Sequence, residues 1–517
     1  MNKELQTVLF YHQETKHSQQ RYARSLGYMD WATQPNPFRT YKGTQTISLA
    51  LCDANATPPY SMLDEELPSA PLLKESLSQF LQFSLGIAAW KESGGSSWAV
   101  RCNASSGNLH PTECYLLLPP TLQEQNAQSS LFHYAPKNHT LECLAHFDTQ
   151  FWNNLEKGSF LLGVSSIVWR EAWKYGERAF RYTQLDAGHA LQALVVSAKI
   201  LGWNISKFEG ISDANIAKIL GFQQKERFFE NEIADMLLLV SPSKANALPS
   251  LEILFNDLPP LYEGIANRLS PQMQDWQIIA SIEEATAQTQ LTHEKVIVPK
   301  ILREASADAK NIILHRRSIH IMEREKSHIT QEEFHTLLQS IAHSLHGDVN
   351  TVHLALFVHR VEEYASGLYF LVRNSEEIRQ LRAQMSPTFL WEVTAFKDLY
   401  LLKKGDFQNL SKTISCNQDI ASDGAFSLGM LANYTEELKK FGAHRYKELY
   451  WECGAIGQQL YLEATSLGLS GTGIGCFLDD MMHDTLGLQS NSFQVLYHFT
   501  VGRGYVDSRI QTKPAYS

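Results

Sequence analysis

The stretch KYGERAFRYTQLDAG, Lys174–Gly188, recurs 266 residues further along the chain as KFGAHRYKELYWECG, Lys440–Gly454. The same offset brings further identical residues into register without gaps, namely Gln192 with Gln458, Ala198 with Ala464, Gly202 with Gly468 and Asp213 with Asp479. In both places small and apolar residues follow the Lys-aromatic-Gly triplet and end at a glycine, which is typical of a helix and its stop. An ordered set of identities at one offset indicates an internal duplication.

The length of 517 residues also favours two domains over one core. We expect an N-terminal extension over 1–70, copy one over 71–290 and copy two over 291–517. Ser281–Asp308 is predicted to connect the copies, and its polar start is a loop or an exposed helix. Short runs typical of strands flank the helical repeats: Cys114–Leu118, Phe160–Val168, Met236–Val240, Thr351–His359, Gly367–Val372 and Phe493–Thr500. Helices alternating with such strands predict an α+β or α/β class with a central sheet.

Composition narrows the class of protein. Hydrophobic residues make up 44% and charged residues 19%, as in a compact globular chain, and the net charge of −10 argues against a nucleic-acid partner. The seven scattered cysteines include no CxxC pair, so we expect reduced thiols, a cytoplasmic location and no metal site. The N-terminus lacks a signal-peptide core. Leu185–Gly202 is interrupted by Asp186, His189, Gln192 and Lys199, which favours a buried helix over a membrane span.

Two polar segments have residues suited to an anionic or planar ligand. His315-Arg316-Arg317-Ser318 offers two guanidinium forks and a hydroxyl, which suit a phosphate, although an isolated segment of this kind is more often a solvated basic turn. Arg101–Pro111, RCNASSGNLHP, combines small hydroxyl residues with Gly and Asn, which let backbone approach a ligand. The alternative for this segment is a polar turn before a strand.

A third segment, Ser470–Cys476 (SGTGIGC), superficially resembles a dinucleotide-binding fingerprint. That motif must follow a strand and open a helix, whereas this one follows a helix ending near Gly468. We therefore interpret it as a close-approach glycine turn. In copy one, Lys207 and Glu209 replace Gly473 and Gly475.

The fourth feature is Lys174-Tyr175, with Arg178 close by in the sequence. A Lys beside a Tyr can hold or move a proton if burial lowers the pKa of the Lys. The structural alternative is a row of helix-surface cations, which we favour for Arg181. Copy two has Phe441 in place of Tyr175, so a phenolic role is confined to copy one.

Taken together, these elements resemble the nitroreductase superfamily, and within it the SagB/ThcOx-type dehydrogenases, which include azoline oxidases. The family's Arg-Arg-Ser phosphate motif matches 316–318, its Pro-Ser-x-Gly-x-x-x-Pro segment resembles 104–111 with Ala104 in place of Pro, and its Gly-x-Gly turn matches 473–475. Arg509 after Val501-Gly502 matches a basic residue that completes the phosphate site, and Lys174-Tyr175 matches the family's catalytic pair. The chain departs from the family in having His320 and Met322 where a further cation and a Phe often follow.

The resemblance implies an α+β fold of tandem nitroreductase-like domains, each with a mostly antiparallel sheet flanked by helices, that form an intramolecular pseudo-dimer. It implies one FMN per chain, bound between the copies. The catalytic residues would be Lys174 and Tyr175. The cofactor-binding residues would be Arg316, Arg317, Ser318, Arg509, Gly473, Ile474, Gly475, Arg101, Ser105, Ser106, Gly107, Asn108 and Arg178.

The function implied is hydride transfer through the flavin N5, either as an azoline-oxidase type dehydrogenase or as a reductase of small organic substrates with NAD(P)H as the electron donor. The substrate would be a small molecule or derived from a peptide, with no nucleic acid or membrane partner. The alternative is a non-catalytic flavin-binding or scaffold subunit of a biosynthetic complex. The sequence does not choose between oxygen and NAD(P)H as electron partner, and the N-terminal RYARSLGYMDWATQPNPFR suggests no role.

Overall fold

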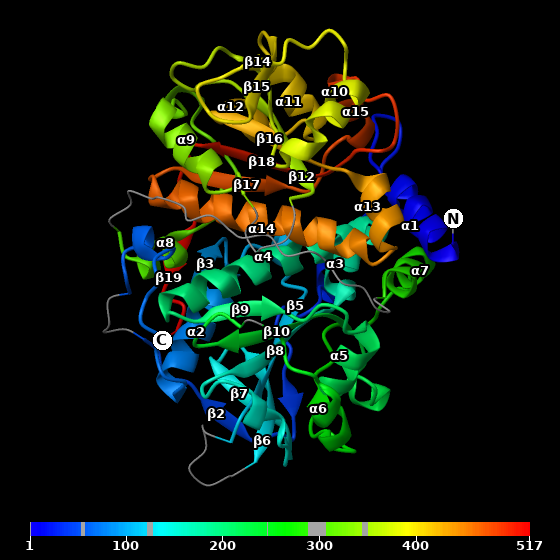
Figure 1. The fold of residues 1–517 in the computed structure, drawn as a ribbon, viewed down its shortest axis with the longest axis vertical. Helices are drawn as coiled ribbons and strands as arrows, with labels where there is room; N and C mark the ends of the chain where they lie inside the picture. Colours follow the sequence, from blue (N-terminus) through cyan, green and yellow to red (C-terminus); the bar gives the residue numbers. More distant parts are fainter. Residues whose placement is uncertain are drawn as a thin grey trace.

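Two antiparallel sheets, one above the other in Figure 1, organise the chain. The computed structural model describes residues 2–52, 57–120, 128–245, 247–287, 307–343 and 350–516. Within these ranges the first sheet has seven strands, in spatial order β2 (Thr46–Ser48), β7 (Thr140–Phe147), β6 (Ser129–Ala135), β5 (Thr112–Leu118), β8 (Phe160–Ser166), β10 (Ile233–Ser241) and β9 (Asn204–Lys207). The second also has seven, in the order β14 (Glu392–Val393), β15 (Leu399–Lys404), β13 (Gly367–Leu371), β12 (Val352–Val358), β16 (Phe426–Ala432), β18 (Gln494–Gly502) and β17 (Ser470–Ile474).

Helices cover these sheets and fill the space between them. The helices of the first half are α1 (Lys3–Glu14), α2 (Lys74–Ser84), α3 (Val168–Tyr175), α4 (Ala179–Ile200), α5 (Asp213–Ile219), α6 (Glu252–Asp257) and α7 (Gln277–Thr286). Those of the second half are α8 (Ala309–His315), α9 (Gln331–Gln339), α10 (Ile378–Gln384), α11 (Gln408–Ile414), α12 (Ile420–Asp423), α13 (Tyr434–Phe441), α14 (Arg445–Ser466) and α15 (Asp479–Leu486). Every strand pair in both large sheets is antiparallel, which settles the class as α+β.

The structure confirms the duplication. Five consecutive elements of the first half, β8, α3, α4, β9 and α5, each begin 266 residues before their counterparts in the second half, β16, α13, α14, β17 and α15. The order of strands within the two sheets corresponds as well, with β5, β8, β10 and β9 matching β12, β16, β18 and β17. The chain is thus a tandem of two equivalent folds.

The longest helices, α4 and α14, lie across each other between the two sheets (Figure 1). They cross so closely that only glycine fits at the crossing. A Cβ on Gly188 would lie 2.3 Å from the Trp451 carbonyl oxygen, and one on Gly454 would lie 2.1 Å from the Leu185 carbonyl oxygen. The most conspicuous matched glycines of the repeat therefore mark the seam between the copies.

Ion pairs cross this seam at equivalent positions. Arg181 Nη1 lies 2.8 Å from Asp479, and Lys447 Nζ, 266 residues after Arg181, lies 2.6 Å from Asp213. Because Asp213 is the counterpart of Asp479, the two contacts are related as the two halves of a symmetric dimer interface are. Arg181 is fully buried, so the expectation that it lies on a helix surface is wrong.

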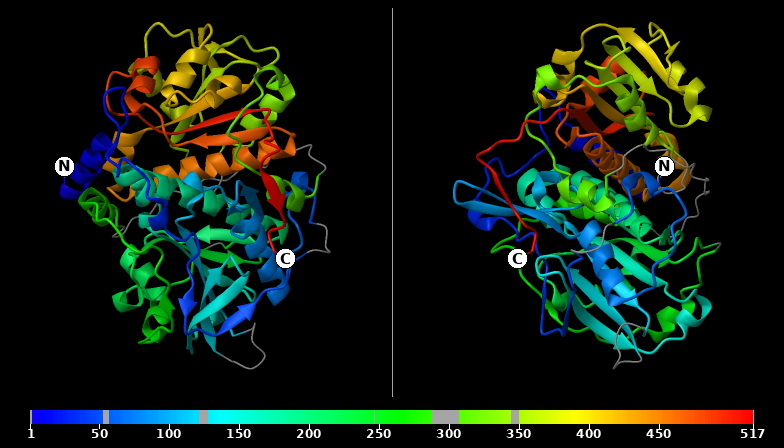
Figure 2. Two further views of the ribbon diagram at one scale, coloured as in Figure 1. Left: turned by 180° about the vertical axis from the view of Figure 1, so that it is seen from behind. Right: turned by 90° about the vertical axis from the view of Figure 1, so that its left-hand side faces the viewer.

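Both ends of the chain extend across the copies (Figure 2). The C-terminal strand β19 (Gln511–Lys513) leaves the second half and pairs with β3 (Ile87–Ser93) of the hairpin that β3 forms with β4 (Ser96–Arg101). At the other end α1 packs on α7, and His12 Nε2 lies 3.1 Å from Gln494 Oε1 of β18. A short pair, β1 (Tyr41–Lys42) with β11 (Ile265–Ala266), completes the strands.

The six predicted strand runs are all present, as β5, β8, β10, β12, β13 and β18. Other strands, among them β6, β7, β15 and β16, were not predicted from the sequence. Leu185–Gly202 forms most of buried α4, as expected, and across the described residues no helix combines the length and apolarity needed to span a bilayer. The polar start of the predicted connection is the end of α7, with Ile282 fully buried, whereas the expected boundary at 290–291 lies outside the described residues.

The glycine seam predicts a specific sensitivity to added side-chain volume. We expect Gly454→Val to lower the free energy of unfolding by about 3 kcal/mol, because its branched side chain meets the backbone of α4, which cannot move aside. Thr465→Val on the same helix, at a part-exposed position, is the control and should cost less than about 1 kcal/mol. Urea denaturation measures both, and equal effects would show that the crossing has room.

Candidate active site

The Lys174-Tyr175 pair lies at the end of α3, where the chain turns sharply into α4. The turn requires Gly176, whose φ is 56° and whose missing Cβ would lie 2.2 Å from the Arg24 carbonyl oxygen. The N-terminal stretch without an assigned role therefore packs against this corner. Lys174 Nζ lies 5.3 Å from the centre of the Tyr175 ring, which in turn lies 4.5 Å from the ring of Tyr182.

The serine-rich segment meets this pair. Gly107 has a φ of 56°, and a Cβ on it would lie 2.6 Å from the Tyr175 hydroxyl oxygen and 3.1 Å from Lys174 Nζ. The structure therefore brings together two groups of predicted site residues from copy one, the 105–108 segment and the Lys-Tyr pair. An exposed backbone turn beside a Lys and a Tyr is an arrangement in which a substrate proton can be received or donated.

Asp186 on α4 holds the serine-rich 105–108 segment in place through hydrogen bonds. Its carboxylate accepts hydrogen bonds from Ser105 Oγ at 2.7 Å, from the Ser106 backbone N–H at 2.9 Å and from Ser106 Oγ at 2.8 Å. Burial raises the pKa of Asp186 to about 7 against the lowering effect of these bonds. Both serine hydroxyls thus donate to Asp186 and are already occupied in this structure. Asn108 donates to the Ala99 carbonyl oxygen at 2.8 Å.

Glu171, one helical turn before Lys174 and Tyr175, is fully buried. Neither of its carboxyl oxygens has a hydrogen-bond partner among the described residues. Burial, and then the charge of Asp186, raise its pKa well above the ordinary value. Burial, Glu171, Tyr182 and Asp186 likewise raise the pKa of Tyr175, so its phenol keeps its proton at neutral pH.

Arg316 joins the start of copy two to copy one. Its Nε donates to the Cys102 carbonyl oxygen at 3.0 Å and its Nη2 to the Arg101 carbonyl oxygen at 2.9 Å. The third nitrogen, Nη1, is buried and has no partner among the described residues. A buried guanidinium N–H without an acceptor is costly, and an anion at this point would satisfy it.

Further cations gather at the same place. Burial and then Arg316 lower the pKa of Arg317 to about 10, and burial and then Arg317 lower the pKa of Lys91, from β3. Among the described residues no carboxylate pairs with any of the three. Ser318 is exposed, and its hydroxyl lies 2.8 Å from that of Tyr461. Cations without a carboxylate partner, beside an exposed hydroxyl, suit the chemistry of a phosphate.

The glycine segment of copy two forms strand β17 over Ser470–Ile474, so the predicted glycine turn is wrong for Gly473 and Ile474. Close approach is nonetheless real, because a Cβ on Gly473 would lie 1.8 Å from the Tyr497 hydroxyl oxygen and one on Gly475 would lie 2.2 Å from the Tyr182 ring. The end of the strand therefore places Gly475 against copy one, at the ring of Tyr182, which contacts that of Tyr175.

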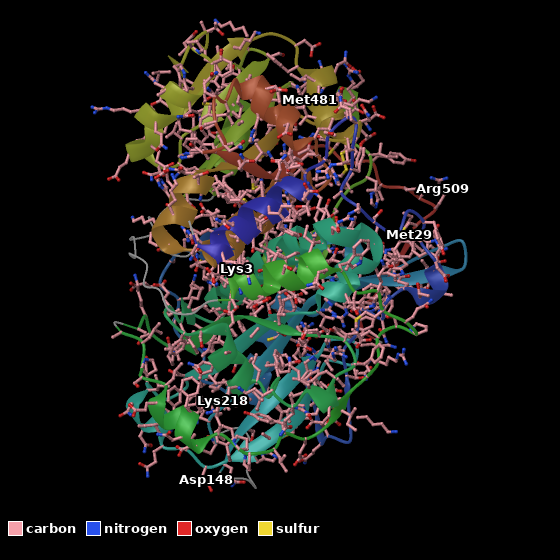
Figure 3. The ribbon with its side chains drawn as sticks, turned by 90° about the vertical axis from the view of Figure 1, so that its right-hand side faces the viewer. Lys3, Met29, Asp148, Lys218, Met481 and Arg509 are labelled. Carbon is pink, nitrogen blue, oxygen red and sulfur yellow. A yellow bond between two sulfur atoms is a disulfide. The ribbon has the colours of Figure 1, made fainter. Side chains whose placement is uncertain are left out.

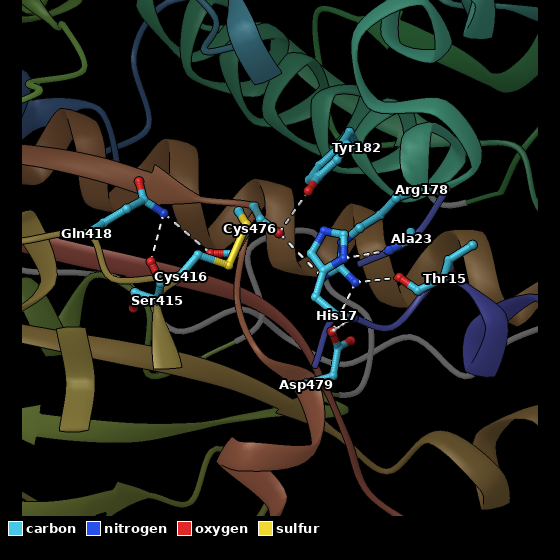
Figure 4. The surroundings of a disulfide bond; sticks show 11 residues. Thr15, His17, Ala23, Arg178, Tyr182, Ser415, Cys416, Gln418, Cys476 and Asp479 are labelled. Carbon is cyan, nitrogen blue, oxygen red and sulfur yellow. Dashed lines mark hydrogen bonds and ion pairs between the residues drawn. A yellow bond between two sulfur atoms is a disulfide. The ribbon is translucent and has the colours of Figure 1, made fainter. Parts of the chain in front are cut away.

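Arg178 ties Gly475 to the rest of the site (Figure 4). Its Nη1 donates to Asp479 at 2.9 Å and to the Thr15 carbonyl oxygen at 2.6 Å, while Nη2 donates to the Gly475 carbonyl oxygen at 3.3 Å. The Tyr182 hydroxyl donates to the same carbonyl at 3.1 Å. Burial alone would raise the pKa of Asp479, but Arg178 and Arg181 outweigh it and hold that pKa far below its usual value.

Cys476, the next residue after Gly475, forms a disulfide with Cys416 (Figure 4). The expectation that all seven cysteines are reduced thiols is therefore wrong for these two. A pairing across 60 residues leaves no local spacing signal in the sequence, because the two half-cystines come from separate loops.

Two predicted residues lie apart from the convergence. Arg509 is exposed at the edge of the molecule and bonds with Asp507, with Nη2 at 2.7 Å from the carboxylate (Figure 3). Arg101 is buried, and its guanidinium donates to the Pro37 and Thr112 carbonyl oxygens. Both guanidinium groups are thus engaged with partners other than the 316–318 segment.

Sequence reasoning missed Lys91, Glu171 and the role of Asp186. A signal existed only for Asp186, as one of the polar residues that interrupt the apolar α4. The next, His189, lies 3.3 Å from Gln458 Oε1 of α14, and Gln458 also accepts from the Ala104 backbone N–H at 3.0 Å. Asp186 and His189 on α4 therefore lie on the side of the helix that contacts the 102–106 segment, directly or through Gln458. In the described part of the chain, no group of His, Cys, Asp or Glu is placed to hold a metal.

Comparison with known proteins identifies similar chains. The model of the nitroreductase family matches residues 69–229 and 313–503. A candidate nitroreductase from Anabaena variabilis ATCC 29413 superposes with a TM-score of 0.72 at 22% identity, covering 96% of this chain and 99% of that one. A candidate nitroreductase from Ralstonia eutropha JMP134 matches at TM-score 0.30, 16% identity and 42% and 97% coverage. The Escherichia coli microcin synthetase McbBCD complex with truncated pro-MccB17 matches at TM-score 0.29, 18% identity and 47% and 94% coverage. No curated protein matches.

The Arg178–Asp479–Arg181 cluster predicts a pH-dependent stability difference. We expect Asp479→Asn to cost about 3–5 kcal/mol near pH 7, because it leaves two buried guanidinium groups without a counter-charge. Since the folded pKa of Asp479 is lowered, its contribution is complete above the unfolded value of about 3.9 and is lost as the pH falls below that value. The difference between variant and wild type in unfolding experiments should therefore shrink below about pH 4.

Asp484→Asn supplies the control for this variant. Asp484 lies on the same helix, α15, and is exposed, so its replacement should cost less than about 1 kcal/mol. Comparable losses in both variants would contradict the assignment of Asp479 as the buried counter-charge.

Proposed function

The chain belongs to the nitroreductase family, and on that premise we propose that it is an FMN-dependent oxidoreductase with one flavin site between its two copies. The observation that carries the proposal is the set of uncompensated cations at the junction of the copies, Arg316 with its unsatisfied Nη1, Arg317 and Lys91. These fit the phosphate of FMN, with Ser318 adding a hydroxyl. Arg509 would join them only after leaving Asp507.

The remaining proposed cofactor residues would surround the ring system. β17, with Gly473, Ile474 and Gly475, provides backbone from copy two, and the Gly107 turn, with Ser105, Ser106 and Asn108, provides it from copy one. Arg178 would offset negative charge near Gly475. Arg101 would act indirectly, by holding the start of the serine-rich segment through its hydrogen bonds to the Pro37 and Thr112 carbonyl oxygens. When bound, FMN supplies the acceptance and return of a hydride at N5, and the protein contributes orientation and electrostatics.

The chain's own chemistry concerns the proton that accompanies the hydride. Lys174 and Tyr175 lie together against the Gly107 turn, so both can contact a substrate held there. Since Tyr175 keeps its proton, it would serve as a donor or relay, with Lys174 beside its ring. A Lys-Tyr pair able to handle the substrate proton favours a dehydrogenase of the azoline-oxidase type, acting on a peptide-derived or small heterocyclic substrate.

Reduction of a small nitro or quinone substrate with NAD(P)H is the second activity to be tested. The first experiment is the visible spectrum of the purified protein, followed by bleaching with dithionite or NADPH and by reoxidation with candidate substrates. Bleaching by NADPH would favour the reductase. If the purified protein takes up no FMN, the remaining alternative is a non-catalytic scaffold subunit.

We predict about one equivalent of FMN per chain. The sequence of copy two has no Ser-Ser-Gly-Asn segment before Gly367-Leu368-Tyr369 and has Phe441 in place of Tyr175, so the reciprocal site is incomplete. Arg317→Ala should weaken the Kd for FMN about ten- to a hundredfold, because an Arg–phosphate bond is charge-assisted. Arg101→Ala should weaken FMN binding less. Two equivalents of flavin, or an unchanged Kd for Arg317→Ala, would refute the site.

We predict that Tyr175→Phe keeps FMN and the fold but slows turnover about a hundredfold or more on a substrate that loses a proton, as general acid–base groups commonly do. Phe441→Tyr is the matched control, since it restores the hydroxyl in the copy without the other site residues, and it should leave kcat unchanged. If Tyr175 only packs, its hydroxyl contributes about 1 kcal/mol of stability and turnover of the variant equals wild type.

A further inference from the structure

His189, a polar residue of buried α4, belongs to a chain of hydrogen bonds that joins the two copies at the candidate site. Its ring lies against Gly457 of α14, where a Cβ would be 2.7 Å from His189 Cε1. Nδ1 lies 3.3 Å from Gln458 Oε1, and Nε2 lies 3.1 Å from the hydroxyl oxygen of Tyr497 on β18. All three side chains are more than nine-tenths buried. In copy two Ala455 stands at the position of His189, so the reciprocal site lacks this imidazole.

The positions of the hydrogens in this chain follow from the backbone of copy one. Gln458 Nε2 donates to the Cys102 carbonyl oxygen at 3.2 Å, and Gln458 Oε1 accepts from the Ala104 N–H at 3.0 Å. A reversed amide would bring two N–H groups together at Ala104, so the orientation of the amide is fixed. The His189 nitrogen that faces Oε1 must therefore carry a hydrogen, which makes Nδ1 the donor.

The other ring nitrogen of His189 is an acceptor, because the ring is neutral. Burial, and to a lesser extent the charge of Arg316, lower the pKa of His189 to about 3. With the hydrogen on Nδ1, the Nε2 atom offers only a lone pair, and the Tyr497 hydroxyl must donate to it. Since that bond uses the only hydrogen of the hydroxyl, the Tyr497 oxygen can only accept from a further partner.

The Tyr497 oxygen lies among residues proposed for the flavin site. It is 1.8 Å from the position that a Cβ on Gly473 would take, so it covers the bare face of that glycine. The backbone N–H of Gly473 donates to the Tyr461 hydroxyl at 2.8 Å, and that hydroxyl lies 2.8 Å from the one of Ser318. On the side of copy one, Gln458 connects the same chain to the start of the serine-rich segment. An acceptor of fixed orientation thus stands between both sets of proposed cofactor residues.

We propose that His189 is a positioning residue that holds the Tyr497 oxygen as a hydrogen-bond acceptor for FMN. The inference rests on the proposed function. FMN has matching donors, namely the N–H of its pyrimidine ring and the hydroxyls of its ribityl chain. A phenol without a fixed partner could turn either its hydrogen or its lone pairs toward the cofactor, whereas His189 leaves only the lone pairs. Tyr497 would contact FMN, and His189 and Gln458 would act through it.

FMN affinity tests each step of the chain. Tyr497→Phe removes the acceptor and His189→Leu removes the group that orients it, so each should weaken the Kd for FMN about tenfold. His189→Gln should stay within about threefold of wild type, because its amide can donate to Gln458 and accept from Tyr497. The double variant Y497F/H189L should bind FMN no more weakly than Y497F alone, since His189 acts through Tyr497.

Tyr369→Phe is the matched control for Tyr497→Phe. Tyr369 lies on β13 of the same sheet, is buried, and donates to the Ala365 carbonyl oxygen at 2.7 Å. Each of the two changes removes one buried hydroxyl group, so both should lower the melting temperature of the flavin-free protein to a similar extent. Only Tyr497→Phe should weaken the Kd for FMN.

The tautomer of His189 is a readout that a packing role would not fix. In protein with ¹⁵N-labelled histidine, the ring signals that disappear in H189Q identify His189. They should show a hydrogen on Nδ1 and none on Nε2 between about pH 5 and pH 9, because the lowered pKa keeps the ring neutral throughout that range.

Two results would overturn the proposal: a hydrogen on Nε2 of His189 in that range, or a Kd for FMN in Tyr497→Phe equal to that in Tyr369→Phe. The NMR measurement needs no flavin. A wild-type protein that binds no FMN would refute the proposed function itself, whereas FMN bound equally by both variants would refute the acceptor and leave the proposed function standing.

Discussion

The close crossing of α4 and α14 is the constraint on which the remaining structure depends. Gly188 and Gly454 allow each helix backbone to touch the other, and no side chain can separate them. The copies are thereby held in an arrangement related by an approximate twofold axis, in which Arg181–Asp479 and Lys447–Asp213 repeat one contact. With the helices in contact, α14 reaches the 102–106 segment of copy one through Gln458. The candidate site thus lies where the two copies meet.

Equivalent positions in the two copies have diverged in charge more than in shape. The helices and strands of the repeat keep their offset and, to within one residue, their lengths. By contrast, Tyr175 corresponds to Phe441, and Ala179 corresponds to Arg445. In copy two, Arg445 neutralises the largely buried Glu437. In copy one the counterpart of that acid, Glu171, is without a hydrogen-bond partner among the described residues, which costs stability. Retained destabilising groups at one copy alone are typical of a functional site.

The sequence predicted what depends on local pattern and on repetition. The duplication, the buried α4 and six strands follow from periodicity and from identities at one offset, and the structure confirms them. Burial of Arg181 did not follow, because its partner Asp479 lies 298 residues away. Three other features had no local signal for the same reason. These are the hydrogen bonds of Ser105 and Ser106 to Asp186, the Cys416–Cys476 disulfide and the electrostatic influence of Arg317 on Lys91. Residue types in the sequence thus indicated which chemistry is possible, whereas the hydrogen-bond and ion-pair partners of those residues became known only from the fold.

Fusion of the copies into one chain explains how such asymmetry arises. In a symmetric homodimer every substitution occurs twice, so an arginine that neutralises an acid in one subunit neutralises it in the other as well. A tandem chain removes that coupling, and Arg445 can coexist with Ala179. The chain ends reinforce the assembly, since β19 of the second half pairs with β3 of the first and the N-terminal segment packs on Gly176. The copies therefore stay paired while each adapts separately, and one copy can supply acid–base groups while the other supplies Arg316, Arg317 and the β17 backbone.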